Sequence, residues 1–200
     1  MTDMQTALRG AAGTLPGPPP ELERRLARRA TEEGLVDVAY AAVDSPVGRL
    51  TVAGTKRGLV LVGYGPHEPL VERLAERLSP RVLEAPARLD DARRELDEYF
   101  EGRRRDFELP LDWSLARGFS QRVLRATAAI PFGEVSTYAG VAARAGSPRA
   151  VRAAGNALGS NPLPVVVPCH RVLRTGGGLG GYTGGLDKKE YLLRLEGVLL

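Results

Sequence analysis

The sequence predicts an α/β (α+β) protein, in which a small N-terminal antiparallel-sheet domain with helices precedes a mainly helical C-terminal domain. Short β-type segments begin after residue 35, apolar residues take helical spacing from residue 68, and two helices joined by a glycine turn follow residue 113. At 200 residues the chain is long enough for two small cores. We therefore expect an extension over 1–34, an N-terminal α/β domain over 35–112 and a C-terminal helix-turn-helix domain over 113–200.

The extension begins with a proline-rich stretch, "PGPPP" at 16–20, which favours a stiff, extended chain. A short helix is expected over 21–34, because Leu22, Leu26 and Ala30 recur every four residues and a glycine follows. This helix is predicted to be a docked or tethering element rather than a functional one.

Three β segments open the N-terminal domain, and "DSPVG" and "TKRG" separate them as turns. We expect a three-stranded meander from the segments 36–43, 49–54 and 58–65. Helical spacing follows in "EPLVERLAERL" and "RLDDARRELDEYFEG", and "FELPLDW" closes the domain as an extended stretch. His67, in the loop between strand and helix, is expected to be an exposed polar residue.

The C-terminal domain begins with two predicted helices. Residues 119–130 show helical apolar spacing and end before a proline. Residues 136–146, "STYAGVAARAG", offer Ser136 as an N-cap and Gly146 as the stop.

A third helix is expected over 147–159, with Ser147 at the N-cap and Pro148 at the first helical position. Together with the preceding helix it makes a helix-turn-helix unit. Arg149 and Arg152 project from its first turns, where guanidinium groups can meet phosphates or stack on bases. Helix-turn-helix geometry is also common outside DNA binding, and an alanine-rich helix packed in the core, with its arginines reaching solvent, is the alternative. The alanines concerned are Ala150, Ala153, Ala154 and Ala157.

Charge divides the chain unevenly. Residues 1–112 hold 17 basic and 20 acidic groups, a net charge of −3, whereas residues 113–200 hold 11 basic and 4 acidic groups, a net charge of +7. A basic C-terminal half indicates an anionic partner, most simply nucleic acid, although a solvated basic face explains the charge equally well.

Composition excludes several classes of protein. The single cysteine excludes an intramolecular disulfide framework, and one cysteine with two histidines leaves too few ligands for a cysteine-rich zinc site. The sequence holds no apolar run long enough to cross a membrane and no signal-peptide pattern at its start. We therefore expect a cytoplasmic protein with no membrane partner and no metal site.

Cys169 lies near the end of a short apolar run that contains three prolines. The run, 161–172, predicts a buried strand that leads to an exposed corner at Cys169. A free thiol has a pKa of about 8.5, so a nucleophilic role needs a base or a positive neighbour, which His170 and Arg171 could supply. A small buried hydrophobe is the alternative for a lone cysteine. The glycine-rich loop 175–185 permits close backbone approach to a ligand.

At these residues the chain resembles a known family. "PCHRV", with "NPLPVVV" before it and "GGLGGYTGGLDKKEYLLRLEG" after it, is similar to the active-site region of the O6-alkylguanine-DNA alkyltransferases, also called methylated-DNA–protein-cysteine methyltransferases. The similarity continues through "FGEVSTYAGVAARAGSPRAVRAAGNALGSNP", "DSPVGRLTVAGTKRGLVLV" and "LDEYFEG…FELPLD", and it covers roughly residues 36–197. It implies DNA repair by stoichiometric, irreversible transfer of an alkyl group from O6-alkylguanine in double-stranded DNA, with base flipping. Repair of O4-alkylthymine stays open.

The resemblance also implies roles for individual residues. Cys169 would accept the alkyl group, and His170 would remove the thiol proton through a water held near Glu196. Asn161 would be the hinge between the recognition helix and the active-site strand. Tyr138 would help to rotate the target nucleotide and would donate a proton toward the departing guanine. No metal or organic cofactor is implied, and the protein is expected to be a monomer.

For DNA, the resemblance makes Arg152 the finger that enters the duplex where the damaged base has left, and Tyr138 a further contact. The remaining DNA contacts would be Ser120, Arg149, Ala150 and Val151.

The chain departs from the family at Gly181, where asparagine is common, and at Thr183, where serine is frequent. The base pocket would be lined by Tyr182, Thr183, Val172 and Pro164.

Two other functions remain open from the sequence. A cysteine-dependent hydrolase would need a distant histidine, for which His67 is the one candidate. A non-enzymatic reader of alkylated DNA would use the same helices without the reactive thiol.

Overall fold

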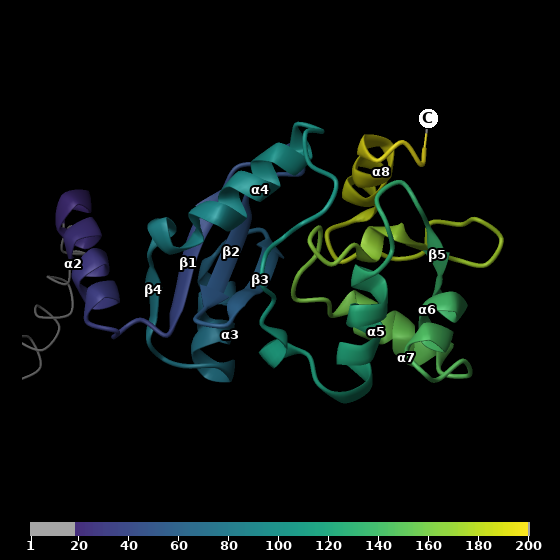
Figure 1. Ribbon diagram of the computed structural model, residues 1–200, viewed down its shortest axis with the longest axis horizontal. Coiled ribbons are helices and arrows are strands. Elements are labelled where there is room, and N and C mark those ends of the chain that lie inside the picture. The colour runs from purple at the N-terminus through teal and green to yellow at the C-terminus, as the bar shows by residue number, and fades with distance from the viewer. Residues whose placement is uncertain (1–18, 200) are drawn as a thin grey trace, which may run out of the picture.

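The computed structural model describes residues 19–199, so most of the proline-rich stretch lies outside the described residues. In Figure 1, the sheet and the helices that belong to it occupy the left half of the picture, and the mainly helical part occupies the right half. The sheet part contains β1 (Val38–Val43), β2 (Leu50–Thr55), β3 (Gly58–Tyr64), α3 (Glu68–Arg77), β4 (Val82–Glu84), η1 (Pro86–Leu89) and α4 (Asp90–Phe100). The helical part contains η2 (Trp113–Leu115), α5 (Gly118–Ala128), β5 (Ser136–Thr137), α6 (Tyr138–Arg144), α7 (Val151–Gly159), η3 (Cys169–Arg171), β6 (Val172–Leu173) and α8 (Leu186–Leu195). The predicted fold class and the order of its two parts are confirmed.

The sheet has the strand order β3-β2-β1-β4. Strands β1, β2 and β3 form the predicted antiparallel meander. β4 pairs with β1 in parallel, so the sheet is mixed rather than purely antiparallel. β4 is not among the elements predicted from the sequence, because three residues are too few to show an alternating pattern.

The edge strand β3 is covered by two segments from outside the sheet. Leu59 donates its N–H to Pro110 O at 2.8 Å and accepts from Asp112 N at 2.8 Å, which places the predicted extended stretch along β3. Farther along, Val62 N donates to Pro162 O at 2.8 Å. The free hydrogen-bonding groups of this edge are thus used to attach the linker and the segment that leads to the cysteine.

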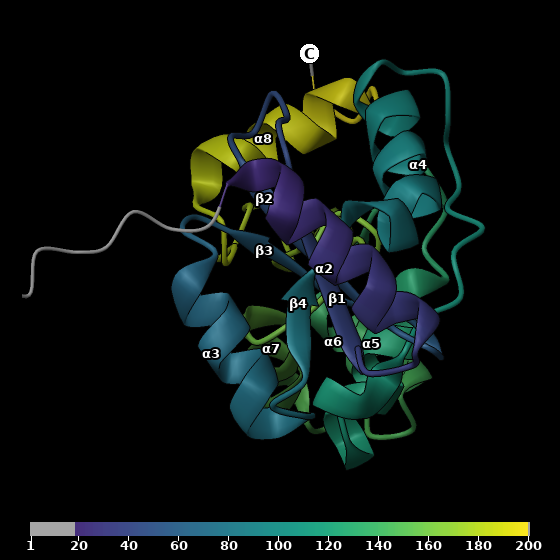
Figure 2. The same cartoon turned by 90° about the vertical axis from the view of Figure 1, so that its left-hand side faces the viewer.

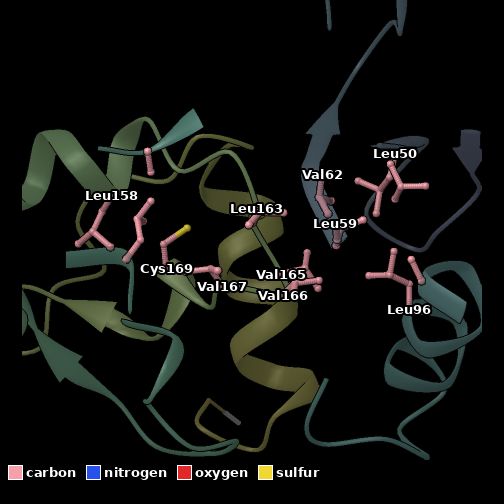
Figure 3. Packing of buried hydrophobic residues seen from close by; sticks show 14 of the residues in the cluster. Leu50, Leu59, Val62, Leu96, Leu158, Leu163, Val165, Val166, Val167 and Cys169 are labelled. Atoms are coloured by element: carbon pink, nitrogen blue, oxygen red, sulfur yellow. The ribbon is translucent and has the colours of Figure 1, made fainter. Parts of the chain in front are cut away.

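One hydrophobic cluster runs through both parts of the molecule. In Figure 3, Val165 and Val166 of the segment before the cysteine lie beside Leu59 and Val62 of β3. Leu96 of α4 belongs to the same cluster. The sheet part therefore supports the segment that carries the cysteine through buried apolar contacts.

The predicted helix of the extension is present as α2 (Pro20–Glu32), with proline in its first turn. In Figure 2, α2 crosses in front of β1 and β4. Among the side chains of α2 that the structure describes, Ala27 is buried and Ala30 packs partly against the core, whereas Leu22 and Leu26 are 43% and 54% exposed. The predicted leucine stripe is therefore not the face that packs.

Other local predictions need correction. Thr137, not Ser136, is the N-cap of α6, because its side chain accepts a hydrogen bond from Gly140 N, while Ser136 pairs in β5. α7 begins at Val151 rather than at 148, since residues 147–150 form a turn. His67 is half-buried and stacks on Tyr40 with ring centroids 5.8 Å apart.

Over residues 19–199, no helix combines the length and the apolar character needed to cross a membrane.

Candidate active site

The segment before the cysteine, 161–168, is buried but irregular, so the predicted strand is wrong. Prolines at 162, 164 and 168 have no N–H to donate, which prevents a regular ladder. Val165 has a φ of 73°, in the left-handed region that a β-branched residue rarely adopts. Such strain persists only where the surrounding structure enforces it, and it is typical of functional sites.

Asn161 holds this segment together from the end of α7. Its Nδ2 donates to Val167 O at 2.9 Å and to Cys169 Sγ at 3.2 Å. Its Oδ1 accepts from Leu163 N at 3.0 Å. The amide therefore links the helix to the cysteine, at the position where a hinge was expected.

Cys169 lies in the short helix η3 and is 5% exposed, so the predicted exposed corner is wrong. Burial raises the pKa of the thiol to about 11, although the hydrogen bond from Asn161 and the charge of Lys189 oppose the shift. The resting thiol is therefore protonated near neutral pH, and a nucleophilic role requires a base.

His170 is fully buried beside the cysteine and contacts Glu196 directly, with Nε2 2.9 Å from Oε1. Burial lowers the pKa of the imidazole, against the effect of the nearby carboxylate. The ionised Glu196 accepts a hydrogen bond from the Nε2–H of His170, so the neutral ring carries its lone pair on Nδ1. Within the described residues, that buried Nδ1 has no hydrogen-bond partner. His170 is thus oriented as a base with one free acceptor.

Glu196 is held by several donors at once. Arg171 binds it in a bidentate pair, from Nε to Oε2 and from Nη2 to Oε1, each at 2.8 Å. Tyr99 of α4 donates its hydroxyl to Oε1 at 2.7 Å. Burial would raise the pKa of Glu196, but the hydrogen bonds from His170 and Arg171 lower it to about 2. The carboxylate stays ionised and fixes the tautomer of His170.

Arg171, Tyr99 and Lys189 hold the site in ways that the sequence did not predict. The sequence indicates Arg171 as a positive neighbour of the thiol, whereas the structure pairs its guanidinium with Glu196. Lys189 is fully buried and donates to Val172 O at 2.6 Å and to Leu179 O, and burial lowers its pKa to about 8. The sequence of α8 does carry a signal for the burial of Lys189, because Lys189 and Glu196 share a helical face with buried leucines.

A pocket of about 260 Å³ opens beside the cysteine. Three predicted site residues, Tyr138, Tyr182 and Thr183, line it together with Cys169. Pro164 and Val172 are buried but do not line it. The full lining is Tyr138, Gly155, Leu158, Gly159, Cys169, Gly181, Tyr182 and Thr183.

Tyr138 closes against the glycine-rich loop. A Cβ at Gly180, which has a φ of 69°, would lie 2.6 Å from the Tyr138 hydroxyl, so a side chain there would displace the ring. Gly181, at the position that departs from the family, has open space around it instead. The loop can therefore approach Tyr138 closely at Gly180, where only glycine fits. At Gly181 there is room for a side chain.

The outward face of α7, on which Arg152 lies three and seven residues before Gly155 and Gly159, borders the pocket. Arg152 is exposed and Val151 is 37% exposed, while Gly155 and Gly159 line the pocket. Ala154 and Ala157 are buried, so only part of the alanine-rich surface faces outward. Among the other predicted DNA contacts, Arg149 is exposed and Ala150 is half-buried in the preceding turn, and Ser120 is half-buried in α5. One short helix thus places an exposed guanidinium beside the mouth of the cysteine pocket.

Comparison with known proteins adds independent findings. Residues 38–113 match the family model "6-O-methylguanine DNA methyltransferase, ribonuclease-like domain", and residues 118–198 match "6-O-methylguanine DNA methyltransferase, DNA binding domain". A methylated-DNA--protein-cysteine methyltransferase of Mycolicibacterium paratuberculosis is 42% identical over 161 residues, which are 80% of this chain and 92% of that protein. The corresponding protein of Methanosarcina barkeri is 36% identical, over 78% of this chain and 96% of its own length.

Solved structures agree with this similarity. The crystal structure of the Mycobacterium tuberculosis O6-methylguanine methyltransferase has a TM-score of 0.68 and 38% identity, and the match covers 80% of this chain and 92% of that one. Mycobacterium tuberculosis OGT in complex with DNA has a TM-score of 0.67 and 36% identity, over 80% and 93% of the two chains.

Proposed function

This chain belongs to the 6-O-methylguanine DNA methyltransferase family, and from that premise we propose that Cys169 is the residue that accepts the alkyl group. The protein is a DNA-binding methylated-DNA–protein-cysteine methyltransferase that repairs DNA by direct alkyl transfer. The observation that carries the assignment of the acceptor is the position of Cys169, which lines a pocket beside α7 and adjoins a buried His170–Glu196 pair. We propose O6-alkylguanine in double-stranded DNA as the substrate.

The first step is removal of the thiol proton. Nδ1 of His170 takes the proton from Cys169 through a water molecule, because this nitrogen holds the free lone pair of the ring. The imidazolium that forms is stabilised by the Glu196 carboxylate, which Arg171 and Tyr99 hold in place. The donor from Asn161 favours the thiolate over the thiol.

The second step is an in-line displacement at the alkyl carbon. The thiolate of Cys169 forms a carbon–sulfur bond as the carbon–oxygen bond breaks, and that electron pair stays with the guanine. Tyr138, at the pocket wall, donates its proton toward the departing guanine and regains one from solvent. The product is a thioether with no leaving group that water displaces under mild conditions. Each molecule therefore acts once, and the step requires neither a metal nor an organic cofactor.

Access to the lesion requires base flipping, because the alkyl group on a guanine oxygen lies inside the base stack. Extrusion costs roughly a few kcal/mol, and a side chain that fills the gap offsets part of that cost. Arg152 is suited to this role, since it is exposed on the same helix whose Gly155 and Gly159 line the pocket.

The two other functions fit the geometry less well. A hydrolase would need His67, which stacks on Tyr40 and does not line the pocket of Cys169. A reader without chemistry would not require a cysteine beside a buried base, and this chain has both.

We also propose that the chain acts as a cytoplasmic monomer with domains at 35–112 and 113–200. The shared hydrophobic cluster and the bond from Tyr99 to Glu196 support a dependence of the second domain on the first. The 1–34 extension supplies no residue to the site in the part that the structure describes.

The proposed function is tested by the stoichiometry of repair. A duplex with one O6-methylguanine is mixed with increasing amounts of protein, and the lesion that remains is quantified. We expect one lesion to be lost per protein molecule, with no further loss on longer incubation. Repair of several lesions by each protein molecule would contradict the proposal.

The role of Arg152 has a separate test. Arg152→Ala is expected to slow repair of the duplex on the order of 10- to 100-fold, because the cost of flipping is no longer offset. Reaction with free O6-methylguanine base should change little, since no stack has to be opened. Rates on both substrates are compared with those of Arg73→Ala, a matched control at an exposed arginine on α3. Equal losses on duplex and free base would refute the finger role.

A further inference from the structure

The sheet part reaches the pocket wall through Tyr64, at the end of β3. Its hydroxyl lies 2.7 Å from the hydroxyl of Tyr182, a residue 118 positions away, and the two rings meet edge to face with centroids 6.1 Å apart. Tyr182 lines the pocket with Cys169, and its ring lies edge-on to His170 at a centroid distance of 6.4 Å. A hydrogen bond thus connects the N-terminal sheet to a wall of the base pocket.

The pair of tyrosines is enclosed by the glycine-rich loop. A Cβ at Gly184 would lie 2.7 Å from Cε2 of Tyr64, so only glycine leaves room for this ring. The Lys188 ammonium lies 5.8 Å from the centroid of the same ring. Burial raises the pKa of both hydroxyls, so that each keeps its proton and the pair remains a neutral hydrogen bond.

Tyr64 stands on a fixed strand. It pairs with Leu50 of β2, and two residues earlier Val62 N donates to Pro162 O at 2.8 Å. The strand is therefore attached to the segment before Cys169 as well as to the glycine-rich loop. A side chain on a rigid element restricts the position of its partner more than another loop residue would.

We propose that Tyr64 is a positioning residue, whose hydroxyl fixes the Tyr182 side chain as the wall against which the extruded base packs. Tyr64 acts through Tyr182 and makes no contact with DNA itself. This inference rests on the proposed function, because it assigns a cause to the shape of the same pocket.

Tyr64→Phe keeps the ring and removes the hydroxyl. The second-order rate of alkyl transfer from an O6-methylguanine duplex is expected to fall roughly three- to tenfold, the loss that corresponds to one neutral hydrogen bond. Affinity for an undamaged duplex of the same sequence should stay unchanged. Tyr191→Phe, a half-buried tyrosine on α8, is the matched control and should react at the wild-type rate.

A double-mutant cycle separates positioning from general stability. In a Tyr182→Phe background, Tyr64→Phe should cause no further loss of rate, because its partner hydroxyl is already absent. A wild-type rate for Tyr64→Phe, or a lowered melting temperature with an unchanged rate, would overturn the proposal. Equal losses of rate in both backgrounds would overturn it too. Failure of the wild-type protein to accept an alkyl group would instead contradict the proposed function.

Discussion

Cys169→Ser is expected to abolish alkyl transfer, with a loss of at least about 10³-fold in rate, because a serine hydroxyl in this buried site is a far weaker nucleophile than a thiolate. The fold should persist. Serine is smaller than cysteine, and its hydroxyl can accept the bond that Asn161 donates to the sulfur. The rate is measured by loss of O6-methylguanine from a duplex.

The control for this substitution is binding. Because Cys169 is 5% exposed and the outer face of α7 is unchanged, the variant should bind the lesion duplex about as well as the wild-type protein does. Residual stoichiometric repair by Cys169→Ser would show that another residue accepts the alkyl group. Loss of both binding and repair would point to misfolding, which circular dichroism would reveal.

Glu196→Gln is expected to have the second-largest effect, on rate and on stability together. The variant leaves the buried Arg171 guanidinium without its carboxylate, and an unpaired buried charge costs roughly 3–5 kcal/mol. His170 also loses the partner that stabilises its protonated form, so the rate should fall about 10²- to 10⁴-fold. Glu190→Gln, on the same helix, is the matched control and should change neither quantity much.

The same variant changes the response to acid. The pKa of Glu196 is about 2 in the folded protein and near 4.5 ordinarily, so its contribution to stability is fully present above about pH 4.5. That contribution is lost as the pH falls from about 4.5 toward 2. The free energy of unfolding, measured by urea denaturation across this range, should fall less steeply for Glu196→Gln than for the wild-type protein. Parallel pH profiles would contradict the assignment of an ionised, paired Glu196.

The sequence predicted the elements whose periodicity is long and regular. α4 and α5 repeat apolar residues over three turns, and the meander is marked by two clear turns, so local physics was sufficient there. β4 was missed because three residues carry no period, and its pairing with β1 is decided by tertiary contact. The predicted start of α7, at Pro148, is too early, because the turn that precedes the helix also suits serine and proline.

The site was predicted less completely than the fold. Resemblance brought Cys169, His170 and Glu196 together, but it did not show that Arg171 grips the carboxylate or that the thiol is buried. The strand expected before the cysteine is an irregular segment, because composition reports burial whereas prolines decide the hydrogen bonding. The contributions of Tyr99 and Tyr64 come from about 100 residues away in the chain, and a single sequence carries no signal for such contacts.

Mass analysis of the protein shows whether Cys169 itself becomes the alkylated product. The wild-type protein is incubated with an excess of duplex that carries O6-methylguanine, and its intact mass and proteolytic peptides are then measured. We predict that each molecule gains the mass of one methyl group and that the peptide containing Cys169 carries it. An unmodified Cys169 after the lesion has been removed, or a methyl group on another residue, would show that Cys169 is not the acceptor.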